Sequence, residues 1–240
     1  MTAFKTIRAR AEKRKGGAEA LARLLPPKPD PTALRKLKDD RVLAEMTKRV
    51  FSAGFAWSVI EAKWPGFEEA FLGFEPSRLA FEPDEFWRRL TMDARIVRNG
   101  AKIASVRQNA RFVLDIAGEH GSFAKFLAQW PPSDEVGLLE LLAKRGSRLG
   151  GATGQMLLRF LGYDAFVATK DVAACLRSAG LDIAAAPTSK RDLAKIQEQF
   201  NAWAKETGLT YRRLSLICAM SIGENYEGDR YGGDVIAGQE

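Results

Sequence analysis

The 240-residue sequence predicts an all-α fold, and two observations support this prediction. Apolar residues recur at helical spacing along most of the chain, for example at Val42, Met46, Val50 and Ala53. No segment alternates apolar and polar residues over the length of a β-strand, and β-branched residues are scattered. From the spacing of the periodic runs and of the breakers between them, we expect about eight to ten helices after Pro31.

Composition divides the chain into three segments. Residues 1–30 predict a basic arm, with one amphipathic helix over residues 4–25 and then the proline-rich linker "LLPPKPDP". Residues 31–222 predict the all-α domain, in which glycine and proline mark the turns, "WPGF" at residues 64–67 among them. Residues 223–240 predict an acidic, glycine-rich tail that has little apolar surface to bury.

The net charge of +7 is unevenly distributed. Residues 1–41 hold 12 Lys/Arg against 5 Asp/Glu, and the rest of the chain balances at 25 against 25. A second basic stretch runs over residues 88–111, where Asp93 is the only acidic residue. This separation of charge suits a surface that binds a polyanion, since each neutralised phosphate releases counterions, although a solvated basic arm explains it equally well.

Several classes of protein are disfavoured by composition. The two cysteines lie far apart in apolar runs, which favours buried free thiols over a disulfide framework, and a single histidine argues against a zinc site. We therefore expect no metal and no cofactor. No stretch is apolar enough for a membrane helix, and the N-terminal residues have no hydrophobic signal core, so we expect a cytoplasmic protein without membrane partners.

The stretch "KRGSRLGGATGQMLLRFLG", residues 144–162, places cations and a glycine-rich turn before an apolar helix. Backbone N–H groups at Gly150 and Gly151, with Thr153 beside them, can approach an anion at the positive end of that helix. We expect a hairpin that grips a DNA phosphate, and a plain helix–helix turn is the alternative. Asp171 follows in "VATKDV", where it is either a helix cap or a catalytic carboxylate.

Two further stretches carry a family resemblance. "FSAGFAWSVIEAKWPGFEEAFLGFEPSRLA" and "DARIVRNGAKIASVRQNARFVLDI" resemble the 3-methyladenine DNA glycosylase I family, which belongs to the helix-hairpin-helix DNA glycosylases. The similarity covers roughly residues 39–127 well and the hairpin moderately. The matching positions are Ala53, Gly54, Phe55, Trp57, Phe71, Phe74, Pro76, Ile96, Val97, Arg98, Lys102, Ile103, Asn109, Ala110 and Arg111.

This resemblance implies an enzyme that excises a damaged, 3-methyladenine-like base from duplex DNA. Such an enzyme holds the flipped base against an aromatic face, and the resemblance assigns that face to Trp57, with Phe55 beside it. It further implies DNA contacts at Arg98 and Lys102, and the wider superfamily places a catalytic aspartate after the hairpin, for which Asp171 is the candidate. The spacing of the remaining phenylalanines, at positions 67, 71 and 74, predicts core residues.

The sequence also departs from the family pattern. The family carries a base-recognising glutamate eight residues before the pocket tryptophan, and here that position is Arg49, which would repel a cationic base. The family's Cys/His zinc site has no counterpart. Two alternatives to excision of alkylated purines therefore stay open: a non-catalytic protein that binds DNA lesions, and a glycosylase for a neutral or anionic base to which Arg49 donates hydrogen bonds.

Overall fold

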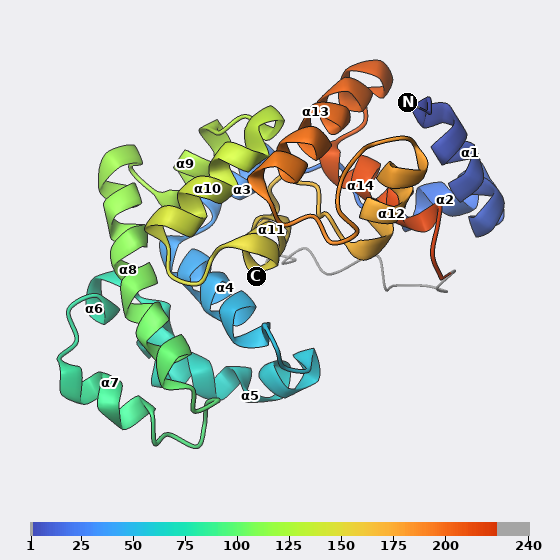
Figure 1. Ribbon diagram of the computed structural model, residues 1–240. Helices are drawn as coiled ribbons and strands as arrows, with labels where there is room; N and C mark the ends of the chain where they lie inside the picture. Colours follow the sequence, from blue (N-terminus) through green and yellow to red (C-terminus); the bar gives the residue numbers. More distant parts are fainter. Residues whose placement is uncertain (1, 225–240) are drawn as a thin grey trace. The chain divides into compact units, whose positions relative to one another are not determined.

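The computed structural model describes residues 2–224 and confirms the all-α prediction, because every regular element in that range is a helix (Figure 1). The described chain forms fourteen α-helices and two 3₁₀ turns, and twelve of these α-helices begin at Pro31 or later, more than the eight to ten that the spacing predicted there. The additional helices are short, such as α3 (Pro31–Lys36) and α6 (Pro76–Leu79), and a helix under two turns long shows no periodicity. The predicted tail lies outside the described residues from position 225 onward.

The chain forms two compact units that alternate along the sequence. The first unit contains residues 1–30, 131–137 and the chain from residue 158 onward, and the second contains residues 31–130 and 138–157. The helices α10 (Glu135–Arg145) and α11 (Gly151–Phe160) each cross a boundary between these segments. The predicted boundary of the arm after residue 30 stays a prediction, as does the extent of the central domain.

The first unit is built from helices at both ends of the chain. Its elements are α1 (Phe4–Lys15), α2 (Ala18–Leu24), the 3₁₀ turn η2 (Pro132–Asp134), α12 (Lys170–Ser178), α13 (Lys190–Thr207) and α14 (Tyr211–Met220). The single helix expected over residues 4–25 is therefore wrong, because Gly16 ends α1 in the left-handed conformation that L-residues avoid.

The basic arm contributes to the core of the first unit. Phe4 and Ile7 are buried in the same apolar cluster as Trp203, and the ring of Phe4 lies 5.1 Å from that of Trp203. Helix α1 packs on α14, and Arg14 donates hydrogen bonds to the carbonyl oxygens of Met220 and Gly223 at 3.1 and 2.6 Å. The arm thus buries its apolar face and uses one of its cations within this unit.

The second unit is built around α4 (Asp39–Ser52) and α8 (Gly100–His120), which pack on each other. Its other elements are α3, α5 (Trp57–Ala70), the 3₁₀ turn η1 (Leu72–Phe74), α6, α7 (Asp84–Leu90) and α9 (Phe123–Gln129), with most of α10 and α11. Asn99 starts α8 by accepting a hydrogen bond from the backbone N–H of Lys102 at 3.1 Å.

Three phenylalanines of the second unit lie in its core, as their spacing predicted. Phe67, Phe71 and Phe74 are fully buried, and Phe67 meets Phe51 at a centroid distance of 4.8 Å. The ring of Trp64 stacks on those of Phe67 and Phe74, at 5.4 Å from each.

The turn predicted at "WPGF" is wrong, because these residues lie inside α5. Gly66 serves close packing there, since a Cβ at this position would lie 2.7 Å from the carbonyl oxygen of Arg95. At this point of the chain, glycine and proline therefore lie where α5 is in close contact with its neighbour, although the sequence pattern predicted a turn.

Candidate functional site

An open pocket of about 150 Å³ lies in the second unit, where the last turn of α4, the first turn of α5 and the first turns of α11 meet. Its wall contains one cation, two hydroxyl groups, one indole ring and three small or flexible apolar side chains. The lining residues are Arg49, Ser52, Ala53, Trp57, Ala152, Thr153 and Met156. The pocket thus joins the predicted base-stacking tryptophan to the predicted hairpin.

Arg49 is held in place by its neighbours on two sides. The side chain is only 3% exposed, and its guanidinium lies over the ring of Trp57 at 4.2 Å from the centroid. One helical turn earlier on α4, the carboxylate of Glu45 lies 2.5 Å from Arg49 Nε. Glu45 was not predicted from the sequence, although its spacing of four residues from Arg49 on a predicted helix was an available signal.

Burial governs the ionisation of this pair. Desolvation raises the pKa of Glu45 from its ordinary 4.5 to about 7, against the opposing attraction of Arg49. Desolvation also lowers the pKa of Arg49, although an arginine starts from a value high enough to stay protonated at neutral pH. The pair therefore presents a local charge between zero and plus one around neutral pH.

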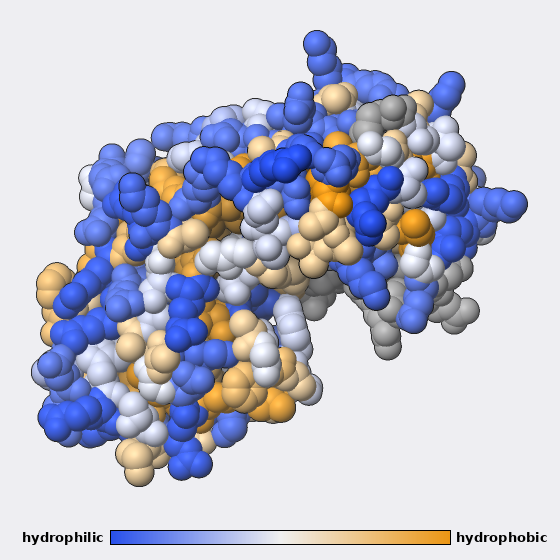
Figure 2. Space-filling view, in the orientation of Figure 1, coloured by the Kyte–Doolittle hydropathy of each residue, from blue (hydrophilic) through white to orange (hydrophobic). Residues whose placement is uncertain are grey.

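The entrance to the pocket exposes aromatic surface. Trp57 is 43% exposed and Phe55 is 41% exposed, whereas the aromatic residues further along α5 are buried or half-buried. Figure 2 shows pale and orange surface over the end of the second unit where α5 begins, among the blue of charged residues. An indole ring that is exposed beside a buried guanidinium is unusual. This arrangement suits a planar ligand that stacks on the ring.

Lys102 supports the loop that carries these rings. Its ammonium donates hydrogen bonds to the carbonyl oxygens of Phe51 at 3.1 Å and Ala53 at 2.6 Å, at the end of α4. It also lies over the ring of Phe55 at 4.7 Å. Burial, and then the charge of Arg148, lowers the pKa of Lys102. This lysine, predicted to contact DNA, is thus buried and has intramolecular partners in the structure.

The predicted hairpin connects α10 to α11 and is anchored to α8. Asn109, a buried residue of α8, donates to the carbonyl oxygen of Ser147 at 3.1 Å and accepts from its backbone N–H at 2.7 Å. Gly150 and Gly151 are exposed at the end of the turn, and Thr153 lies half-buried in the pocket wall. Asn109 therefore fixes the position of the hairpin beside the pocket. The sequence alone did not reveal this role.

These features lie in a segment that matches a known family. The family model described as methyladenine glycosylase matches residues 34–137, which include α4, α5, α8 and the pocket residues on them. The hairpin turn and Asp171 lie beyond the matched segment.

Solved structures of 3-methyladenine DNA glycosylase I are also similar to the chain. One is 23% identical and covers 57% of this chain and 81% of its own, and the enzyme from Staphylococcus aureus is 25% identical with coverages of 52% and 77%. A single-residue variant in complex with 3-methyladenine is 24% identical with coverages of 62% and 84%. Each of the three has a TM-score of 0.47. No curated protein sequence matches the chain.

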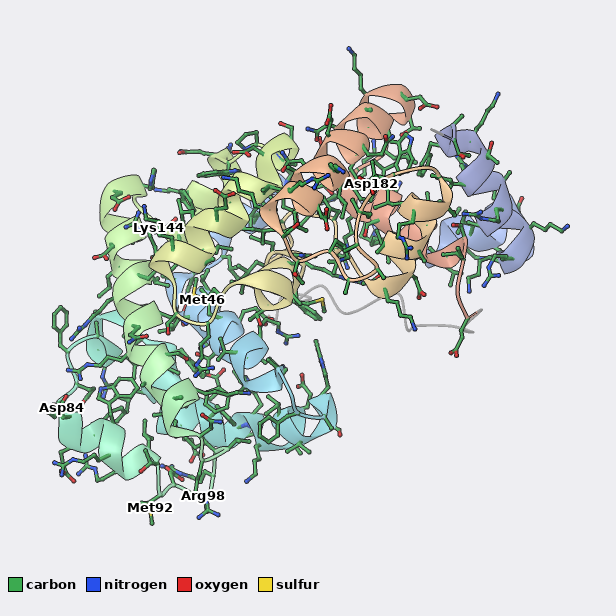
Figure 3. All side chains as sticks on the ribbon, viewed as in Figure 1. Met46, Asp84, Met92, Arg98, Lys144 and Asp182 are labelled. Atoms are coloured by element: carbon green, nitrogen blue, oxygen red, sulfur yellow. The ribbon has the colours of Figure 1, made fainter. Side chains whose placement is uncertain are left out.

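Two predicted site residues lie away from the pocket wall. Arg98 is exposed in the loop before α8, and its side chain points away from the ribbon in Figure 3. Asp171 lies in the first unit, in the first turn of α12, where Thr169 is the residue that caps the helix by accepting from Val172 N. The Asp171 carboxylate lies directly against Gly223. The capping alternative considered for Asp171 thus belongs to Thr169.

Within residues 2–224, no helix is long and apolar enough to cross a membrane. In the same range, no three or more His, Cys, Asp or Glu side chains are grouped so that they can hold a metal ion. The two cysteines, both in the first unit, are buried and free.

Proposed function

We propose that this chain is a DNA glycosylase that hydrolyses the bond between a damaged base and its deoxyribose. The observation that carries the proposal is the exposed ring of Trp57 at the entrance of a pocket, within the segment that matches the family. A base leaves the stack only if its lost neighbours are replaced, and an indole face supplies that replacement. The match to this family makes alkylated purines the first substrates to test.

In the proposed reaction the duplex binds first and the damaged nucleotide rotates into the pocket. The C1′–N bond then breaks, the base leaves with its electron pair, and a water oxygen forms the new bond to C1′. The proton that this water loses goes to an uncharged leaving base, or to solvent when the base was cationic. The protein has to hold the base and stabilise the positive charge that develops on the sugar. A stacking ring and a carboxylate suffice for these tasks, without a cofactor.

We assign the contacts with the DNA backbone to the hairpin and to the basic surface of the second unit. Gly150 and Gly151 offer exposed backbone at the start of α11, and Thr153 adds a hydroxyl group. Arg98 is exposed and available to a second phosphate. Lys102 is proposed as a positioning residue, because its ammonium holds the loop that carries Phe55 and Trp57.

Asp171 is proposed as the carboxylate that stabilises the sugar cation. Support comes from its place in the sequence after the hairpin and from its half-buried position at the start of α12. Asp171→Asn should abolish excision while DNA binding persists. Asp182→Asn, a change at an exposed aspartate of the same unit that pairs with Lys195, is the matched control and should leave excision unchanged.

Release of bases from damaged duplex DNA is the deciding assay. Duplexes treated with a methylating agent, and duplexes that carry single deaminated bases, are incubated with the protein and the free bases are separated by chromatography. Release of any damaged base, lost in Asp171→Asn, supports the proposal. Absence of release from every substrate, in a protein that binds those duplexes, would contradict it.

A second candidate function is binding of DNA lesions without excision, and Arg49 is the observation that favours it. The family's glutamate position is occupied by a buried arginine whose guanidinium covers one side of the stacking ring. Arg49→Glu distinguishes the two functions. A gain of excision in this variant would mean that the natural chain has lost the chemistry, and a loss would mean that Arg49 serves the chain's own substrate.

A further inference from the structure

The wall of the pocket offers hydrogen-bond donors and no carboxylate. Of the seven lining residues, all of them described, Arg49 is the only charged one, and Ser52 and Thr153 add hydroxyl groups. A guanidinium has only N–H donors, and a hydroxyl group can both donate and accept. The polar part of this wall is therefore suited to acceptor atoms on a ligand.

Glu45 changes neither the donor character of the pocket wall nor the sign of its charge. It lies one helical turn from Arg49 on α4, is buried, and is not among the residues that line the pocket. Burial raises its pKa to about 7, so that near neutral pH it balances the charge of Arg49 in part and never exceeds it. A positively charged base thus meets a wall whose charge is zero or positive, and gains no attraction from it.

The ring of Trp57 adds a further constraint. The guanidinium of Arg49 lies over this ring at 4.2 Å, so that its positive charge already interacts with the electrons of the indole. A cationic base that stacks on the same indole competes with that charge for the ring, whereas an uncharged base does not. Stacking and wall polarity therefore favour the same kind of ligand.

We propose that the base held in this pocket is uncharged and carries a carbonyl oxygen that accepts from Arg49, as in a deaminated purine. The inference rests on the proposed function, because it takes the pocket beside Trp57 as the place of a flipped base. It makes Arg49 the residue that determines specificity. Glu45 becomes a positioning residue, since it fixes the guanidinium without touching the base.

Binding to three matched duplexes tests the inference. Each carries one variable purine opposite cytosine: hypoxanthine, which is uncharged with a carbonyl group; 7-methylguanine, which is cationic with a carbonyl group; and adenine, which is uncharged without one. A 2′-fluoro sugar at that nucleotide slows cleavage in all three. We expect the hypoxanthine duplex to bind at least about tenfold more tightly than either of the others, as one hydrogen bond to a charged group allows.

Two variants separate charge from packing. Arg49→Gln keeps a donor of similar length and should reduce the preference for hypoxanthine over 7-methylguanine to within about threefold. The double variant E45R/R49E keeps an ion pair on α4 but turns the carboxylate toward the pocket, and it should bind the 7-methylguanine duplex more tightly than the hypoxanthine duplex. Thermal melting of both variants checks that they are folded, and a fold-preserving Arg49→Gln suffices if the double variant unfolds.

The possible results distinguish the proposed glycosylase function from the proposal that the pocket holds an uncharged base. Equal affinity for the three duplexes, or tighter binding of 7-methylguanine by the natural chain, would overturn the inference even if bases are excised. Tight binding of hypoxanthine together with no release from the unfluorinated duplexes would sustain the inference on binding and remove the catalytic proposal. Release of cationic methylpurines in preference to hypoxanthine would leave the glycosylase function standing and the inference wrong.

Discussion

The two units use buried polar groups in different ways. In the first unit, a buried and a half-buried carboxylate satisfy backbone N–H groups: Glu135 Oε2 accepts from Phe166 N at 2.8 Å, and Asp164 accepts from Tyr211 N and Arg212 N at 3.2 and 3.0 Å. In the second unit, the buried carboxylate of Glu45 instead pairs with a side chain that lines a pocket.

This difference distinguishes polar groups that stabilise the fold from polar groups that serve a ligand. Asp164 accepts from two backbone N–H groups at the start of α14, where the first N–H groups of a helix have no internal partner, so its carboxylate stabilises that helix end. The pair of Glu45 and Arg49 satisfies no helix end. Two charged side chains are costly to bury, and the structure gains from them a fixed cation at the pocket wall. The first unit should therefore respond to substitution through stability, and the second through ligand binding.

The largest effect is expected in the first unit, at the basic arm. Phe4→Ala removes a ring that is buried against Trp203, and it should lower the free energy of unfolding by about 3–5 kcal/mol. Phe81→Ala, at an exposed phenylalanine of the second unit, should change it by less than about 0.5 kcal/mol. Denaturant unfolding of both variants checks this. A small effect at Phe4 would mean that the arm is a separable DNA-binding appendage.

The pH dependence of stability tests one buried acid in each unit, Glu45 and Glu135. Because the folded-state pKa of Glu45 is raised from 4.5 to about 7, its contribution to stability is present below pH 4.5 and is lost as the pH rises to about 7, by at most about 3 kcal/mol. Glu135, whose pKa burial raises, acts in the same direction. Unfolding of Glu45→Gln and Glu135→Gln across this range should show a smaller loss in each. A decline as steep as that of the natural chain in Glu45→Gln would show that the pair is solvated.

Substitution of Asn109 in the second unit should weaken DNA binding more than substitution of Asn201 in the first unit. Asn109→Ala breaks both hydrogen bonds to Ser147, which should cost about 1–3 kcal/mol of stability and weaken DNA binding through a loosened hairpin. Asn201→Ala also breaks two hydrogen bonds, to Ser133 and Tyr211 in the first unit. It should destabilise the protein similarly without changing the affinity of the folded fraction for DNA. Equal DNA affinities for the two variants would remove the hairpin from the interface.

The smallest expected effect concerns one phosphate contact. Arg98→Ala should reduce the magnitude of the slope of log affinity against log salt by about 0.9, because one fewer phosphate is neutralised. Arg191→Ala removes an arginine that is also exposed, in the first unit, and the slope should stay the same. Titrations at four salt concentrations measure both slopes, and matching changes would indicate nonspecific attraction.

The fold class could be predicted from the sequence, and Trp57, which the sequence singled out, lines the pocket, but the contacts that position it were missed. The fold class follows from helical periodicity, which local sequence carries, and the roles of Trp57 and Phe55 came from family resemblance. The pair of Glu45 and Arg49 is local, and its four-residue spacing on α4 was a signal that went unused. The bond from Asn109 to Ser147 joins positions 38 apart, and pairings between distant residues leave no periodic signal. Gly66 misled the prediction for the same reason, since its contact with Arg95 lies 29 positions away.

The central claim is that Trp57 serves a ligand, and a comparison of two tryptophans tests it most directly. Trp57→Ala and Trp203→Ala are measured side by side for thermal stability and for affinity to an abasic-site duplex. Trp203 is 2% exposed in the core of the first unit, and its loss should cost about 3–5 kcal/mol of stability with unchanged affinity in the folded fraction. Trp57→Ala should lose little stability and about 1–3 kcal/mol of binding free energy. A large loss of stability with unchanged affinity at Trp57 would contradict the account.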